Sequence, residues 1–129
     1  MSHVPEQLRY TKTHEWIRED KQWMTVGITD HAQTMLGDLV YAELPEVEGG
    51  FTTGQECAVL ESVKAAADIY CPVTGAIVEV NTAVIDNPQL INRDPYGQGW
   101  LFRIKPTHTA NDQLLTSDQY VQLVAREAH

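Results

Sequence analysis

Two β-type runs of residues meet at a short link near the middle of the chain. The first run starts at Cys57, the second ends before Pro72, and Lys64 lies in the link between them. This pattern predicts a β-hairpin over residues 57–72 with Lys64 at its tip. Because the tip of a hairpin projects from its sheet, we expect the lysine side chain to be exposed to solvent.

The other charged residues in the central part of the chain are all acidic. Residues 22–92 contain ten carboxylates, and Lys64 supplies the one formal positive charge among them. A lysine that stands apart from other amines suits an enzyme that must find and acylate one particular amine. The alternative is an ordinary solvated lysine on a turn, and the residues that flank Lys64 have to decide between the two.

Composition limits both the size and the partners of the fold. A chain of 129 residues with 43% apolar and 21% charged residues is predicted to form one globular domain over residues 1–129. Its formal net charge of −9 repels polyphosphates, so we expect no nucleic-acid partner. No apolar run reaches the ~18 residues of a membrane span, so no membrane association is expected.

The start of the chain carries no secretory signal; we expect the bacterial cytoplasm, or the mitochondrion if a transit peptide has been removed.

The rest of the chain predicts a mainly β fold of six or seven short strands. A short helix is predicted between a cap at Thr29 or Asp30 and Gly37, and a C-terminal helix over about 117–127 with Ser117 as its N-cap. Such elements favour a flattened β-barrel or sandwich with short helices and a C-terminal helix. Besides the hairpin, strands are expected over residues 10–18, 23–28, 39–44, 76–80 and 100–104, with a loop over residues 45–54.

The residues that usually carry catalysis or bind metals do not form a known pattern. The five histidines are dispersed, so no metal site is expected. Cys57 and Cys71 occupy strand-like positions, where we expect buried, reduced thiols. Glu61 and Asp68 are the charges nearest to Lys64 in sequence, and they favour its ammonium form, which is a poor nucleophile. The chain is therefore predicted to have no catalytic residue, and Lys64 suits an attachment point better than a catalyst.

The residues around Lys64 resemble a known modification site. Residues 61–70, followed by the turn 72–75, closely resemble the lipoyl-attachment hairpin of lipoyl-carrier domains. Biotin carriers share this fold but typically have methionine on both sides of the lysine, where this chain has Val63 and Ala65. The resemblance thus implies a lipoyl-carrier fold with lipoate covalently bound to Lys64.

Other segments narrow the resemblance to the H-protein family of the glycine cleavage system. They are residues 14–16, 27–33, 37–38, 43–45 and 95–105, and the resemblance extends to the C-terminal helix. In this family the lipoyl arm accepts an aminomethyl group from the P protein, a PLP-dependent glycine decarboxylase. The T protein, a tetrahydrofolate-dependent aminomethyltransferase, takes the group over, and the L protein, dihydrolipoyl dehydrogenase, reoxidises the arm. The resemblance implies these three partners and a lipoylating enzyme, and a carrier that is not itself an enzyme.

The resemblance also implies residues that contact the arm. Thr13, Glu15 and Asp68 match positions near which the family docks its loaded arm, and a carboxylate there can pair with a cationic aminomethyl nitrogen. Alternatively, Glu61 and Asp68 help the lipoylating enzyme to recognise the hairpin, and Glu15 and Asp68 can equally be solvated residues. Two other functions also stay open: an H-like protein that relays lipoate to other complexes, and a non-lipoylated acidic interaction module.

Overall fold

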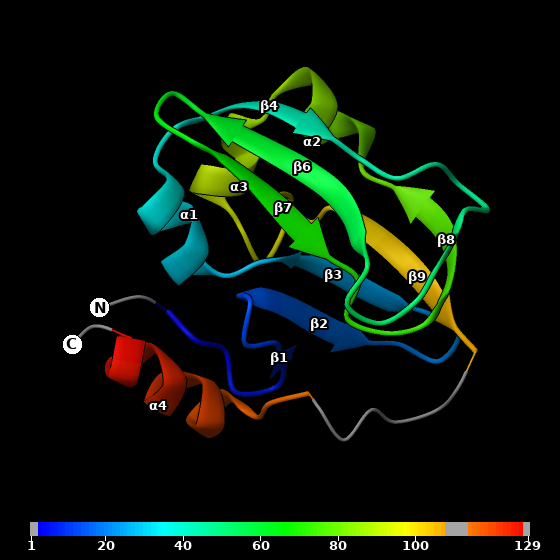
Figure 1. Cartoon of the computed structure of the whole chain (residues 1–129), viewed down its shortest axis with the longest axis horizontal. Helices are drawn as coiled ribbons and strands as arrows, with labels where there is room; N and C mark the ends of the chain where they lie inside the picture. Colours follow the sequence, from blue (N-terminus) through cyan, green and yellow to red (C-terminus); the bar gives the residue numbers. More distant parts are fainter. Residues whose placement is uncertain (1–2, 108–113, 128–129) are drawn as a thin grey trace.

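The strands of the chain form two antiparallel sheets in the computed structural model, which describes residues 3–107 and 114–127. The larger sheet contains, in spatial order, β1 (Arg9–Tyr10), β2 (Glu15–Glu19), β3 (Met24–Ile28), β9 (Phe102–Pro106), β8 (Gly75–Val80) and β5 (Gly50–Phe51). The smaller sheet contains, in order, β4 (Leu39–Glu43), β6 (Glu56–Ser62) and β7 (Ala66–Tyr70). In Figure 1 the smaller sheet faces the larger one.

Apolar side chains fill the space between the two sheets. Leu60 of β6 and Ile69 of β7 belong to one buried cluster with Val26 of β3 and Ile104 of β9. Side chains along a strand alternate between its two faces, so each strand contributes its inward set to this cluster. The predicted mainly β class is thus confirmed, in the form of a flattened sandwich with short helices and a C-terminal helix.

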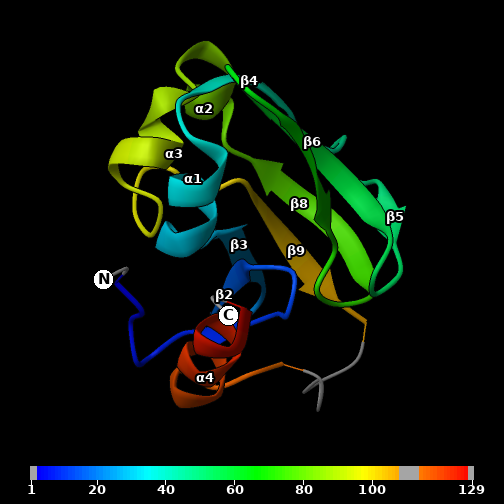
Figure 2. The ribbon, with the colours of Figure 1, turned by 60° about the vertical axis from the view of Figure 1, so that its left-hand side comes forward.

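Helices lie at two places around the sandwich. They are α1 (Asp30–Leu36), α2 (Thr82–Asp86), α3 (Gln89–Arg93) and α4 (Ser117–Glu127). Figures 1 and 2 show α1, α2 and α3 together at one end of the sheets, whereas α4 lies beside β1, where its Tyr120 reaches the start of α1. Tyr120 anchors α4, because its ring stacks on that of Tyr10 with the centroids 4.7 Å apart and 12° between the planes. None of these helices, in the part of the chain that the structure describes, is long and apolar enough to cross a membrane.

The ends of two helices test the predicted caps. Thr29 is the N-cap of α1, where its hydroxyl accepts a 3.1 Å bond from the backbone N–H of Ala32, and Gly37 ends the helix at a φ of 82°. The prediction of Ser117 as the N-cap of α4 is wrong. Thr116 and Gln119 form a capping box instead, in which each side chain bonds the backbone N–H of the other residue, at 2.9 and 3.2 Å.

Four elements differ from the sequence expectations. The strand expected over residues 10–18 is divided, because a turn over residues 11–14 separates β1 from β2. The other three differ because of contacts between distant residues. The two-residue strand β5 lies in the predicted loop and pairs with β8. The helix α2 was not predicted; Asn81 caps it, and its Val84 is fully buried. Strand β9 starts two residues later than expected, because the carbonyl of Trp100 binds the Asn81 amide and the N–H of Leu101 binds Val26.

Candidate functional site

Lys64 lies in the turn between β6 and β7, which pair from Glu56 to Tyr70. A 2.7 Å bond from the backbone N–H of Ser62 to the carbonyl of Ala65 closes this turn. The Lys64 side chain is exposed, and it makes no ion pair with any residue that the structure describes. Lys64 is therefore accessible to a modifying enzyme, as a hairpin tip should be.

Ser62 fixes the shape of this turn, a role that the sequence analysis missed. Its hydroxyl accepts bonds from the backbone N–H groups of Lys64 at 3.3 Å and Ala65 at 3.0 Å. Serine commonly binds the backbone two and three residues ahead in this way, so a serine two positions before the lysine was the available signal. The N–H of Val63 also donates to the carbonyl of Asp38 at 3.1 Å, which ties the tip to the chain before β4.

Asn92 of α3 holds the backbone segment that lies next to the hairpin tip. Its side-chain oxygen accepts a 2.9 Å bond from the N–H of Leu39, and its amide donates to the carbonyl of Gly37 at 2.9 Å. The lysine stem passes close to this segment, since a Cβ placed on Gly37 would lie 3.5 Å from Cε of Lys64. The backbone beneath the lysine is thus held by side-chain bonds from another element.

Glu61 and Asp68 lie on the outer face of the smaller sheet. Both are exposed; Glu61 pairs with Ala66 and Asp68 pairs with Val59 across the hairpin. Glu43 of β4 flanks Val59 on its other side. This face is therefore acidic and open to a partner enzyme.

Glu15 lies at the start of β2, far from Glu61 in sequence, and is only 1% exposed. It points to the same side of its strand as Ile17, which belongs to the core between the sheets. Oε1 accepts bonds from the hydroxyls of Thr13 at 2.6 Å and Thr11 at 2.5 Å, and Oε2 accepts a 3.3 Å bond from the backbone N–H of Tyr70. Thr11 was not predicted, although it lies only two residues before Thr13.

Burial changes the acidity of this carboxyl group. Removal from water raises the pKa of Glu15, and the bonds from Thr11, Thr13 and Tyr70 offset only part of that effect. The three hydrogen-bond donors thus stabilise the carboxylate, but they do not fully compensate for its loss of hydration. A cation that entered the site would supply the missing stabilisation.

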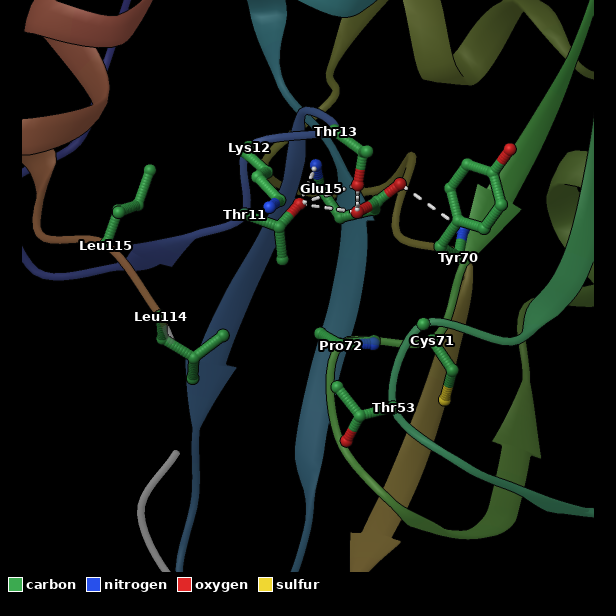
Figure 3. A pocket seen from close by; sticks show the side chains of 11 residues that line it. Thr11, Lys12, Thr13, Glu15, Thr53, Tyr70, Cys71, Pro72, Leu114 and Leu115 are labelled. Carbon is green, nitrogen blue, oxygen red and sulfur yellow. Dashed lines mark hydrogen bonds between the residues drawn. The ribbon is translucent and has the colours of Figure 1, made fainter. Parts of the chain in front are cut away.

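A pocket of about 740 Å³ opens above the Glu15 carboxylate (Figure 3). The Thr11–Glu15 turn forms one wall, Tyr70 and Cys71 another, and Leu114 and Leu115 an apolar side. Lys12 and Thr13 belong to the first wall, and Thr53, Gly54 and Pro72 complete the lining. The structure thus brings Thr13 and Glu15 together in one pocket, whereas Asp68 is not among the residues that line it.

Cys71 lines this pocket, and Cys57 lies next to Cys71. Both thiols are free and buried; Cys57 donates to the carbonyl of Ile69 and Cys71 to that of Val73. A hydrogen bond with the neighbouring Cys71 thiol, reinforced by burial, raises the pKa of the Cys57 thiol far above its ordinary value. Cys57 is therefore a structural thiol rather than a nucleophile.

Lipoate on Lys64 fits this arrangement. The pocket begins at Tyr70, at the other end of β7 from the hairpin tip. At the usual rise of a strand, the four steps from Ala66 to Tyr70 span ~13 Å. A lysine side chain lengthened by an octanoyl-length acyl group spans a comparable distance. Lys64 would hold the group covalently, and its far end would reach the apolar side of the pocket and the Glu15 carboxylate.

Comparison with known proteins identifies the family. The family model described as glycine cleavage H-protein matches residues 8–127. The chain is 52% identical over 121 residues to the glycine cleavage system H protein of Legionella pneumophila strain Corby, covering 93% of this chain and 97% of that protein. It is 50% identical over 129 residues to the H protein of Shewanella sp. strain W3-18-1, covering 98% and 100%.

A solved structure agrees with these sequences. The crystal structure of a glycine cleavage system H protein from Mycobacterium marinum superposes with a TM-score of 0.89 at 41% sequence identity. The match covers 95% of this chain and 99% of that one. Sequence and fold thus agree along nearly the whole length of the chain. The chain belongs to the glycine cleavage H-protein family.

Proposed function

We propose that Lys64 carries the lipoyl group of this H-protein family member, and that the chain shuttles the aminomethyl group of glycine from the P protein to the T protein. As a member of this family the chain is a lipoyl carrier of the glycine cleavage system rather than an enzyme. After the T protein has taken the aminomethyl group, the L protein reoxidises the arm. The observation that carries the proposal is an exposed lysine at the tip of a tightly closed hairpin, within reach of a pocket with a buried carboxylate.

Each part of the chain has a definite task in this proposal. When bound, the lipoyl group would supply the sulfur to which the aminomethyl cargo is attached. Ser62 and Asp38 fix the backbone at the tip, so the modifying enzyme meets Lys64 in one orientation. Glu61 and Asp68 present acidic side chains to that enzyme on the outer face. Glu15 and Thr13 bind the cationic nitrogen of the cargo in the pocket, where the apolar wall keeps water away.

The smaller role of Asp68 is a revision of the sequence interpretation. Glu15 and Thr13 share a hydrogen bond in the pocket, and that contact supports their joint role with the cargo. Asp68 instead lies on the exposed face with Glu61, so we assign it to recognition by the lipoylating enzyme. The bacterial relatives support a bacterial source, and the cytoplasmic location stays a prediction.

Two measurements test the proposal. The chain is produced in cells with intact lipoylation and its peptides are mapped by mass spectrometry; we expect one lipoyl group, on Lys64. Aminomethyl transfer is then reconstituted with purified P, T and L proteins. Lys64→Arg should abolish transfer, because arginine keeps the charge but cannot form the amide. Lys105→Arg, at an exposed lysine on β9, should leave transfer unchanged.

The outcomes separate the remaining functions. An unmodified Lys64 in such cells would favour a non-lipoylated acidic interaction module. A lipoylated chain that fails to exchange aminomethyl groups with the P and T proteins would favour an H-like relay for other complexes. Transfer by Lys64→Arg would overturn the assignment of the lysine itself.

A further inference from the structure

Three side chains that can bind a metal meet on the side of the molecule where α1 and α4 approach each other. They are His14 in the turn before β2, His31 in the first turn of α1 and Glu127 in the last turn of α4. One ligand atom from each lies within 4.8 Å of the others. We refer to these residues as the His14–His31–Glu127 cluster. None of the three residues lines the pocket, and the proposed carrier function makes no use of them.

His14 is held in place by its backbone and by both of its ring nitrogens. Its φ of 74° is in the left-handed region, which few residues other than glycine adopt and which often marks a functional position. Nε2 lies 3.0 Å from a carboxylate oxygen of Glu127, and Nδ1 lies 2.8 Å from the hydroxyl of Tyr120. The ring is thus aimed at the carboxylate and cannot turn away without losing two contacts.

His31 has a buried nitrogen with no partner. Its Nε2 is inaccessible to solvent and forms no hydrogen bond with any described residue. A buried polar atom left without a partner destabilises the folded state, so such atoms are rare and call for an explanation. The His31 ring lies against that of His14, with the centroids 5.1 Å apart. A metal ion between the two imidazoles would give this nitrogen its partner.

The hydroxyls of Tyr120 and Thr29 form a hydrogen-bonded chain next to the His14 ring. Histidines that bind metals usually have such a partner on the other ring nitrogen. The Tyr120 hydroxyl lies 2.7 Å from that of Thr29, which accepts the N–H of Ala32 as the α1 cap. With its proton on Nδ1, His14 donates a hydrogen bond to the Tyr120 hydroxyl, which in turn donates to that of Thr29. In that tautomer Nε2 of His14 presents a lone pair towards Glu127, and two facing acceptors require a cation between them.

We propose that the His14–His31–Glu127 cluster binds one divalent transition-metal ion, with Zn²⁺ as the preferred ion. Two imidazole nitrogens and one carboxylate oxygen are a donor set that Zn²⁺ accepts, with water as the fourth ligand. Glu127 has a side chain 41% exposed, which leaves room for that water. The separate positions of the histidines in sequence gave no sign of the site, because the fold alone brings them together.

The separations require a small adjustment on binding. Two atoms that each bind Zn²⁺ at ~2.1 Å cannot lie more than ~4.2 Å apart. In a tetrahedral site two such atoms lie ~3.4 Å apart, so a pair that is wider than this has to close, by up to ~1.4 Å. Because Nε2 of His14 already lies 3.0 Å from the Glu127 carboxylate, the closure brings His31 towards this pair.

The metal would join three elements that are far apart in sequence. Glu127 would fasten the end of α4, and His31 the start of α1, to the turn that carries His14. Thr13 and Glu15, the neighbours of His14 in sequence, line the pocket, and His14 does not. The ion would thus stabilise the turn that forms one wall of the pocket.

Binding is measured on the full lipoylated chain with its arm oxidised, so that the arm offers no thiolates. We expect calorimetric titration with ZnCl₂ to show one ion per chain. At a concentration of ~100 Kd the ion should raise Tm by about 5–10 °C relative to an EDTA-treated sample. His31→Gln should weaken binding at least ~10-fold and remove most of the Tm shift. His3→Gln, at a histidine whose hydrogen bonds are made by its backbone, should change neither.

A spectroscopic readout separates metal binding from a merely structural cluster. Long-range ¹H–¹⁵N spectra should show His14 protonated at Nδ1 and should show Nε2 of both histidines shifting on addition of Zn²⁺. Absence of binding in the wild-type chain would overturn the proposal. So would binding of equal strength in His31→Gln, or histidine ¹⁵N shifts that do not respond to zinc.

Discussion

The carboxylate of Glu15 accepts a hydrogen bond of 3.3 Å from the backbone N–H of Tyr70. Glu15 starts β2 in the larger sheet, and Tyr70 ends β7 in the smaller one, so this bond joins the two sheets at the pocket. It also places the buried charge at the end of the strand that starts at the hairpin tip. The carboxylate therefore contributes both to the architecture and to the proposed binding of the cargo.

Glu15→Gln should shorten the lifetime of the aminomethyl cargo. The amide has nearly the shape of the carboxylate but no charge, so it loses the pairing with a cationic nitrogen. A charged hydrogen bond of about 1.5–3 kcal/mol corresponds to a roughly 10- to 100-fold faster loss. The measurement is the rate of formaldehyde and ammonia release from the loaded carrier. Glu19→Gln, at the exposed end of the same strand, should leave the rate unchanged, and an equal rate in Glu15→Gln would contradict the docking role.

Gly75→Ala should destabilise the fold strongly. A Cβ at this position would lie 2.2 Å from the carbonyl oxygen of Lys105, so the paired strands β8 and β9 would have to separate. We expect the free energy of unfolding in urea to fall by about 3 kcal/mol.

Gly50→Ala provides the matched control for this substitution. Gly50 also pairs with β8, but no atom lies within 4 Å of a Cβ placed on it. The free energy of unfolding should change by no more than about 0.5 kcal/mol. Equal effects of the two substitutions would show that chain entropy, and not the close approach to Lys105, determines the result.

Asn92→Ala should lower stability by about 2–3 kcal/mol. It removes the acceptor of the N–H of Leu39, a fully buried residue, and the donor to the Gly37 carbonyl. The measurement is the urea midpoint, with Asn87→Ala, an exposed asparagine after α2, as the control. A midpoint equal to that of the wild type would mean that water replaces the amide.

Cys57 should react slowly with iodoacetamide in the native protein. Its thiol is buried and its pKa is raised, so the reactive thiolate is scarce at neutral pH. Peptide mass spectrometry should show alkylation at least ~100-fold slower than in urea-unfolded protein. Comparable rates in the folded and unfolded states would place the thiol at the surface.

The sequence predicts best what neighbouring residues determine. The hairpin around Lys64 and the ends of α1 follow from alternation, turn residues and a capping hydroxyl, all within a few positions of each other. The prediction of the N-cap of α4 was wrong for a local reason as well, because Thr116 and Ser117 are both good caps. Gln119 decides between them, because it stands three residues after Thr116.

Contacts between distant segments are what the sequence leaves open. Strand β5 contains only Gly50 and Phe51, which have no strand signal until β8 lies beside them. Glu15 resembles a solvated strand residue until the smaller sheet covers it. The approach of His31 to His14 likewise depends on how α1 packs, and no spacing along the chain encodes it.

Lys64 is carried by the hairpin of the smaller sheet, whereas Glu15 belongs to the larger sheet. The distance between the attachment point and the pocket therefore depends on residues outside both. The span that the arm must bridge depends on the length of β7 and on how the two sheets pack against each other at its end. Protein cores are close-packed, so a change of volume at Leu60 or Ile104 is transmitted to the side chains of both sheets that pack against it. Side chains that never meet the cofactor therefore tune its reach, and substitutions in the core and in the pocket have to change together.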